Sequence, residues 1–136
     1  AIAESVGDVM DSLLDDIRRK GLQFEMNVTK DVVLTINHQA LHMLLMNLLR
    51  NAVQYTESGF VRVEYDQRRL TISDSGVGIE PDYLPHLYER FIRGSEQGQD
   101  LGIGLAIVKR ICHYYNWTLE VDSTPGQGTS FYIIFP

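Results

Sequence analysis

The stretch Asp74-Ser-Gly-Val-Gly78 restricts the fold and the possible ligands more than any other part of the sequence. It follows the alternating segment Leu70–Ser73, so it lies where a predicted strand runs into a loop. A carboxylate at that point can accept a hydrogen bond from an exocyclic amine such as that of adenine. Gly76 and Gly78 let the backbone adopt positive φ and approach a flat ligand closely. Because Asp-x-Gly turns are common, this stretch alone leaves a simple turn and a base pocket equally open.

A pair of asparagines lies upstream, in a segment from His38 to Gln54 whose leucines predict an apolar helix with Asn37 as its N-cap. Asn47 and Asn51 are spaced i, i+4 and therefore share one face of that helix. Asparagine is a poor helix former, so two on one face indicate amides that point into a polar cavity. A carboxamide oxygen is a hard ligand of the kind that Mg²⁺ prefers. A pair of surface asparagines is the alternative.

Asp74–Gly78 and the asparagine pair are two polar islands within apolar sequence, and Gly102-Ile-Gly-Leu105 is the third. It opens a helix predicted over residues 103–115. Amides exposed at a helix N-terminus form an anion site, and glycine lets phosphate oxygens come close. A dinucleotide fingerprint fits poorly, because a polar loop precedes the glycines and Ile107 stands where Gly or Ala is expected. That polar loop, Arg93–Asp100, predicts a mobile lid. Together the three islands supply a metal ligand, a base-reading carboxylate and phosphate-binding amides, which is what binding Mg-ATP requires.

The hydrophobic pattern predicts ten elements in the order αββαββααββ. Helices are expected near residues 6–20, 38–54, 83–91 and 103–115, and strands near 24–29, 32–36, 60–65, 70–73, 119–123 and 130–135. Hairpins outnumber strand–helix–strand crossovers, so the sheet should be mixed and mostly antiparallel. We expect helices to cover one face of it, which gives a two-layer α/β sandwich of the α+β class.

Composition is that of one soluble domain. The 136 residues contain a single cysteine, Cys112, which we expect in the core, and they contain no apolar run long enough to span a membrane. The net charge of −6 argues against a nucleic-acid partner. The basic residues near the glycine-rich islands, which could offset that charge for a phosphate ligand, are Arg90, Arg93, Lys109 and Arg110. Because the chain starts inside a helical pattern, we expect a fragment of a longer protein.

Five motifs in order resemble the N, G1, F, G2 and G3 boxes of sensor histidine kinases. They are Asn47-Leu-Leu-Arg-Asn-Ala-Val-Gln-Tyr55, Asp74-Ser-Gly-Val-Gly-Ile79, Tyr88-Glu-Arg-Phe91, Gly102-Ile-Gly-Leu-Ala-Ile-Val108 and Gly126-Gln-Gly-Thr-Ser-Phe131. The resemblance covers essentially the whole chain. It implies the Bergerat ATP-binding fold, with ATP in a pocket that the lid closes, and this agrees with the α+β prediction.

The resemblance also implies roles for individual residues. Asn51 coordinates Mg²⁺ with Asn47 beside it near the phosphates, Asp74 reads the adenine amino group, and Phe91 anchors the lid. The nucleotide-binding positions are Asn47, Asn51, Tyr55, Asp74, Gly76, Gly78, Ile79, Arg90, Phe91, Arg93, Gly102, Gly104, Leu105 and Thr129. One departure is Gln54, where the family usually has Lys or Arg in contact with a phosphate. Either ATP binding is weaker for this reason, or Arg90 or Arg93 makes that contact instead.

The implied activity is transfer of the ATP γ-phosphate to a histidine on an adjacent dimerisation domain, for relay to a response regulator. Related ATPases that hydrolyse ATP place a glutamate one turn before the metal asparagine. Here that position is Asn47, and an amide is no general base. The resemblance implies that the intact protein is a membrane-anchored homodimer with this domain, itself not inserted, on the cytoplasmic side of the bacterial inner membrane. Two alternatives stay open: a nucleotide-sensing module without transfer, which Gln54 favours, and a serine kinase, which residues 88–91 and 102–108 disfavour.

Overall fold

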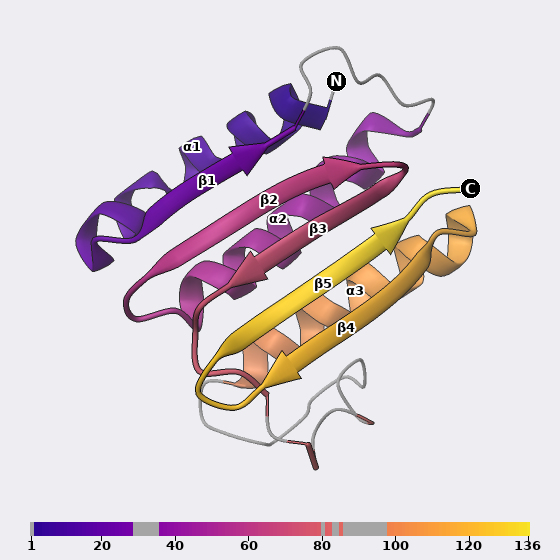
Figure 1. Ribbon diagram of the computed structural model, residues 1–136. Helices are drawn as coiled ribbons and strands as arrows, with labels where there is room; N and C mark the ends of the chain where they lie inside the picture. The colour runs from indigo at the N-terminus through magenta and orange to yellow at the C-terminus, as the bar shows by residue number, and fades with distance from the viewer. Residues whose placement is uncertain (1, 29–35, 80, 83–84, 86–97) are drawn as a thin grey trace.

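The computed structural model describes residues 2–28, 36–79, 81–82, 85 and 98–136, with side chains in the last helix described from residue 104. The elements are α1 (Ile2–Lys20), β1 (Gln23–Asn27), α2 (His38–Gln54), β2 (Phe60–Asp66), β3 (Arg69–Asp74), α3 (Gly98–Tyr115), β4 (Thr118–Thr124) and β5 (Gly128–Ile134) (Figure 1). The strand expected at 32–36 and the helical turn expected at 83–91 lie almost wholly outside the described residues.

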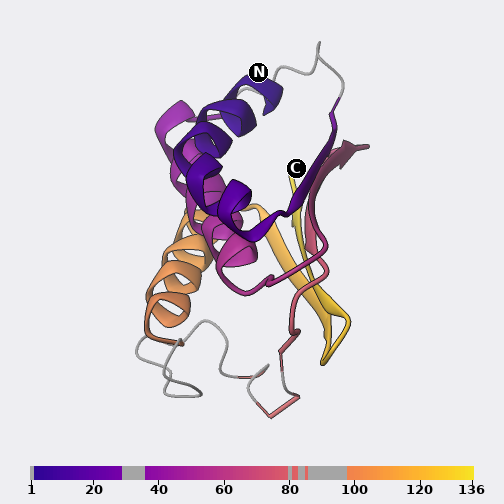
Figure 2. The same ribbon diagram turned by 90° about the vertical axis from the view of Figure 1, so that its left-hand side faces the viewer.

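The strands form one five-stranded sheet in the order β1-β2-β3-β5-β4. Strand β1 pairs with β2 in parallel, while β2–β3, β3–β5 and β4–β5 are antiparallel. The three helices that the structure describes cover one face of the sheet, as Figure 2 shows from the side. The predicted two-layer α+β sandwich with a mixed, mostly antiparallel sheet is therefore confirmed. None of the described helices has the length and apolarity that crossing a bilayer needs.

Helix α2 is the central helix, and side chains form hydrogen bonds with unpaired backbone groups at both of its ends. At its start the Asn37 side chain accepts a hydrogen bond from the Ala40 N–H at 2.9 Å, which confirms the predicted N-cap. At its end the Lys20 ammonium, from the last turn of α1, donates to the carbonyls of Val53 and Gln54 at 2.9 and 3.0 Å. Carbonyls in the last turn of a helix have no partner within the helix. Lys20 therefore fixes the end of α2, where the asparagine motif finishes, against α1.

Rows of side chains cross the inner face of the sheet, and one of these rows becomes polar. Strand register aligns two apolar rows, Tyr65–Leu70–Ile133–Leu119 and Val63–Ile72–Phe131–Val121. The next row is Val61–Asp74–Thr129–Ser123. It lies where β3 ends and the glycine-rich loop begins, so the sheet places a carboxylate and two hydroxyls at the edge of the core. The predicted core residue Cys112 is buried elsewhere in that core, and burial raises the pKa of its thiol to about 12.

Candidate functional site

Asp74 is a buried carboxylate at the last position of β3, with 9% of its surface exposed. Burial raises its pKa from 3.8 to about 6, and hydrogen bonds from the backbone N–H groups of Gly76 and Thr129 partly oppose that rise. The Gly76 N–H lies 2.9 Å from Asp74 Oδ1. Within the described part of the chain, no cation forms an ion pair with Asp74. A carboxylate held in the core without a counter-charge is destabilising to the fold, and such groups are concentrated at functional sites.

The two glycines after Asp74 are required by packing. A Cβ on Gly76 would overlap with the carbonyl oxygen of Tyr55 and would lie 2.9 Å from the Thr56 hydroxyl. Gly78 has a φ of +76°, and a Cβ there would overlap with the carbonyl of Thr124. From the sequence, both glycines are expected to let a flat ligand approach the backbone closely. The structure adds that they let the loop backbone pass directly against its neighbours.

Three hydrogen bonds made by the loop's own backbone groups hold the loop after Asp74 in place. The Val77 N–H donates to the Tyr55 carbonyl at 3.2 Å, and the Gly126 N–H donates to the Val77 carbonyl at 2.8 Å. The Ile79 N–H donates to Ser123 Oγ at 2.8 Å. The loop is thus fixed between the end of α2 and the β4–β5 turn, and it brings the predicted G1 and G3 motifs into contact.

The side chains of the two asparagines in α2 differ in their hydrogen bonding. Asn47 is 7% exposed; its Nδ2 donates to the Met43 carbonyl at 2.8 Å, and its Oδ1 accepts from Arg50 Nη2 at 3.3 Å. Asn51 Oδ1 is buried and has no hydrogen-bond partner among the described residues. Buried polar atoms normally have a partner, so an orphan calls for an explanation such as an ion. A carboxamide oxygen without a protein partner fits a Mg²⁺ ligand, and Asn51 matches this role better than Asn47.

Helix α3 passes close to α2 at Asn47. A Cβ on Gly104 would lie 3.1 Å from Asn47 Oδ1, so glycine permits this approach. The predicted start of α3 near residue 103 is wrong, because the helix begins at Gly98. Gly102 and Gly104 therefore lie inside α3 rather than at its exposed N-terminus, and Leu105 is a buried core residue. Contacts of these three residues with phosphate stay predictions.

The remaining predicted site residues are placed only in part. Tyr55 follows α2, and its N–H donates to the Asn51 carbonyl at 3.1 Å. Arg90, Phe91 and Arg93 lie outside the described residues, as does most of the predicted lid; only residues 98–100 of that segment are described, and they are helical.

A family model described as histidine kinase-, DNA gyrase B- and HSP90-like ATPase matches residues 36–136. The chain belongs to this ATPase family. The match includes the asparagine pair, Asp74 and the hairpin that carries Thr129, so the site described above lies within the family's own region.

Bacterial sensor kinases are among the relatives of this ATPase domain. Sensor histidine kinase AtsR of Burkholderia thailandensis is 28% identical over 148 residues, covering 99% of this chain and 25% of AtsR. Phosphate regulon sensor protein PhoR of Pseudomonas aeruginosa is 40% identical over 95 residues, covering 62% of this chain and 21% of PhoR. Full-length ShkA, crystallised with AMPPNP, superposes with a TM-score of 0.83 at 25% identity, over 100% of this chain and 30% of ShkA. The resemblance to histidine kinases is thereby confirmed, and the chain spans about a quarter of the length of its first curated relatives.

Two residues of the candidate site were not expected from the sequence. Thr56 is fully buried, and its Oγ1 donates to the Ala52 carbonyl at 2.7 Å next to Gly76. Ser123 lies opposite Thr129 in the β4–β5 hairpin, with 2.8 Å between their hydroxyl oxygens. The signal for Ser123 was its position two residues before Pro125-Gly126, which pairs it across the turn with Thr129.

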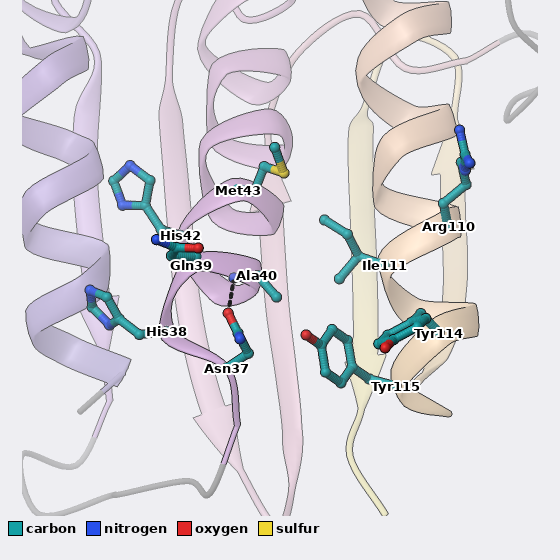
Figure 3. Close-up of a pocket in the computed structure, with 10 residues that line it drawn as sticks. All are labelled: Asn37, His38, Gln39, Ala40, His42, Met43, Arg110, Ile111, Tyr114 and Tyr115. Carbon is teal, nitrogen blue, oxygen red and sulfur yellow. Dashed lines mark hydrogen bonds between the residues drawn. The ribbon is translucent and has the colours of Figure 1, made fainter.

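A cavity of about 700 Å³ lies away from this site, between the N-terminal end of α2 and the C-terminal half of α3 (Figure 3). It is lined by Asn37, His38, Gln39, Ala40, His42, Met43, Arg110, Ile111, Tyr114 and Tyr115. None of the predicted nucleotide-binding residues whose side chains the structure describes lines it. Arg110 was grouped by the sequence analysis with the basic residues near the glycine islands, but α3 carries it to this cavity instead. Among the described residues, His38 and His42 have no further His, Cys or acidic side chain with which to form a metal site.

Proposed function

We propose that this domain binds Mg-ATP and presents its γ-phosphate for transfer to a histidine of another domain. The observation that carries the proposal is Asp74, a buried carboxylate at the end of the central strand β3 that forms no ion pair with any described residue. An ionised carboxylate offers only acceptor positions. It therefore selects a ligand that donates hydrogen bonds, and the exocyclic amine of adenine is such a donor. The family membership and the AMPPNP complex of ShkA support adenine nucleotide as that ligand.

Asn51 would hold the magnesium ion through Oδ1, the buried oxygen that has no partner among the described residues. When bound, Mg²⁺ neutralises phosphate charge and fixes the orientation of the nucleotide. Asn47 would keep its orientation through its bonds to Met43 and Arg50, one turn earlier on the same face. The remaining nucleotide contacts are those that the family resemblance carries over, including Tyr55 and Thr129.

Transfer is favoured over hydrolysis by the chemistry of Asn47. A water nucleophile needs a general base within hydrogen-bond reach, and a carboxamide does not take up a proton at neutral pH. At the position where hydrolytic relatives place a glutamate, this chain has Asn47, whose side chain already bonds its own helix. We therefore infer that the domain positions ATP and that the acceptor comes from outside it. The acceptor would be a histidine on a neighbouring dimerisation domain, followed by an aspartate on a response regulator.

The wider setting follows from the relatives. Because they are sensor kinases about four times longer than this chain, we propose that the domain works within a membrane-anchored homodimer, on the cytoplasmic side. The second candidate is a nucleotide-sensing module that closes on ATP without transferring phosphate. Gln54 favours it, since this position usually carries a phosphate-binding cation in the family.

Radiolabelled ATP distinguishes the two functions in the full-length protein. Incubation with γ-labelled ATP and magnesium should give a protein-bound phosphate that is labile in acid and stable in base, as phosphohistidine is. Asn51→Ala should abolish the label, while Ser130→Ala, a hydroxyl removal on β5 outside the proposed site, should leave it unchanged. Binding of ATP without any label on the full-length protein would favour the sensing module instead.

A further inference from the structure

The polar row on the inner face of the sheet continues beyond the residues assigned so far. Register pairs Asp74 with Thr129 and Thr129 with Ser123, so the three side chains stand side by side on β3, β5 and β4. We propose that Ser123 is a positioning residue, which orients the Thr129 hydroxyl and the Ile79 backbone so that the pocket prefers adenine to guanine. This inference rests on the proposed function.

All three contacts of Ser123 can be hydrogen bonds at the same time in only one arrangement. A serine hydroxyl has one hydrogen to donate and two lone pairs to accept with. The Ile79 N–H, at 2.8 Å, uses one lone pair, and the Gly128 carbonyl, at 3.1 Å, can only receive the hydrogen. The second lone pair then faces Thr129 Oγ1 at 2.8 Å. Thr129 must therefore be the donor in that contact.

This arrangement fixes the polarity of the pocket. Because the Thr129 hydroxyl hydrogen is directed at Ser123, its lone pairs are left as acceptors only. The Thr129 N–H is also engaged, since it donates to the Asp74 carboxylate. The polar row thus offers acceptors next to one another and no free hydroxyl hydrogen. Adenine carries an amino group at C6, which can donate hydrogen bonds to these acceptors. Guanine carries a carbonyl oxygen there, and two acceptors that face each other cannot form a hydrogen bond.

Ser123 also fixes the loop that bounds the pocket. Its bond to the Ile79 N–H is one of the three that hold residues 77–79, and it is the one made by a side chain. Removing the hydroxyl leaves the Ile79 N–H without its partner and releases the hydrogen of Thr129. A released hydrogen can turn toward the ligand, so the pocket would then also accept a carbonyl oxygen.

The test compares ATP and GTP affinities of hydroxyl variants by calorimetry with magnesium. Ser123→Ala should weaken ATP binding about tenfold, the effect expected for losing one buried hydrogen bond, while GTP affinity should stay about the same because the released Thr129 hydrogen can bond its carbonyl oxygen. The ATP-to-GTP preference should therefore fall about tenfold. Ser123→Thr keeps a hydroxyl and should restore the preference. The control is Ser130→Ala, whose hydroxyl donates to Ser73 at 3.0 Å and touches neither Thr129 Oγ1 nor Ile79.

A double-mutant cycle separates positioning from a structural effect. Thr129→Val removes the hydroxyl that Ser123 is proposed to orient, so Ser123→Ala should change the ATP-to-GTP preference little in that background. An unchanged preference in Ser123→Ala, or losses that simply add, would overturn the inference while leaving ATP binding intact. If the unsubstituted domain binds neither nucleotide, the proposed function fails first, and this inference fails with it.

Discussion

Replacing Asp74 by asparagine should stabilise the fold and weaken ATP binding at the same time. The pKa of Asp74 rises from 3.8 to about 6 in the folded protein, chiefly because the carboxylate is buried. Each pKa unit corresponds to about 1.4 kcal/mol, so keeping the charge at neutral pH lowers the free energy of unfolding by about 3 kcal/mol. Asparagine removes the charge but turns an NH₂ group toward one of the two N–H donors, which costs about 1 kcal/mol. The net gain should be about 2 kcal/mol.

The sign of the pH dependence follows from the raised pKa. The folded state binds the proton more tightly than the unfolded state, so the wild-type domain has the full stability of this group below pH 3.8 and loses it as pH rises toward about 6. The net advantage of Asp74→Asn should therefore be complete, at about 2 kcal/mol, at pH 7.5 and about a third as large at pH 5. ATP affinity of the wild type should fall as pH drops through about 6, because the protonated carboxyl is no longer a pure acceptor.

Urea unfolding at pH 7.5 and pH 5, with nucleotide calorimetry at pH 7.5, measures both effects. Asp122→Asn is the matched control, because Asp122 is an exposed carboxylate on β4, which β5 separates from the Asp74 strand, and should change neither quantity. ATP affinity of Asp74→Asn should fall by about 10- to 100-fold, as expected for losing a hydrogen bond to a charged group. A variant that is less stable than wild type and binds ATP normally would refute the argument, since the carboxylate would then serve the fold alone.

Three further substitutions test other parts of the site, and a fourth, Gly7→Ala in α1, is a control. Asn51→Ala removes a buried oxygen that has no partner among the described residues, so the free energy of unfolding should stay within about 1 kcal/mol while magnesium no longer improves ATP binding; retained magnesium dependence would exclude Asn51 as the ligand. Gly76→Ala introduces an overlap with the Tyr55 carbonyl and should lower the free energy of unfolding by about 2–4 kcal/mol in urea titrations. Gly7→Ala, with open space at its Cβ, should instead be neutral or stabilising. Gln54→Lys should tighten ATP binding by calorimetry, and an unchanged affinity would mean that another cation already contacts the phosphates.

Much of the fold could be predicted because its elements carry local signals. The α2 leucines, the Asn37 cap and the β2–β3 hairpin lie within short segments whose periodicity and turn residues determine them. The start of α3 was placed five residues late, since its first turn is polar and contributes nothing to the apolar pattern from which the boundary was read. Arg110 was assigned to the wrong end of α3 because closeness in sequence to the glycines was taken for closeness in space.

The site was predictable where motifs are contiguous and not where contacts cross the sheet. Asp74 with its glycines and the asparagine pair could be found from residue type and spacing. The turn at Pro125-Gly126 signals the pairing of Ser123 with Thr129, but the contacts of Ser123 with Ile79 and of Thr56 with Gly76 could not be predicted, because these partners lie far apart in the chain. Their roles depend on strand register and on how closely the loop passes the end of α2, and these are properties of the folded chain.

The most direct test of the central claim is a calorimetric titration of this domain with a non-hydrolysable ATP analogue, with and without magnesium, and with GTP as the control. The account predicts saturable binding of the ATP analogue that magnesium strengthens and that GTP does not reproduce. Absence of binding in both conditions, or equal binding of GTP, would contradict the assignment of Asp74 and Asn51 to adenine and metal.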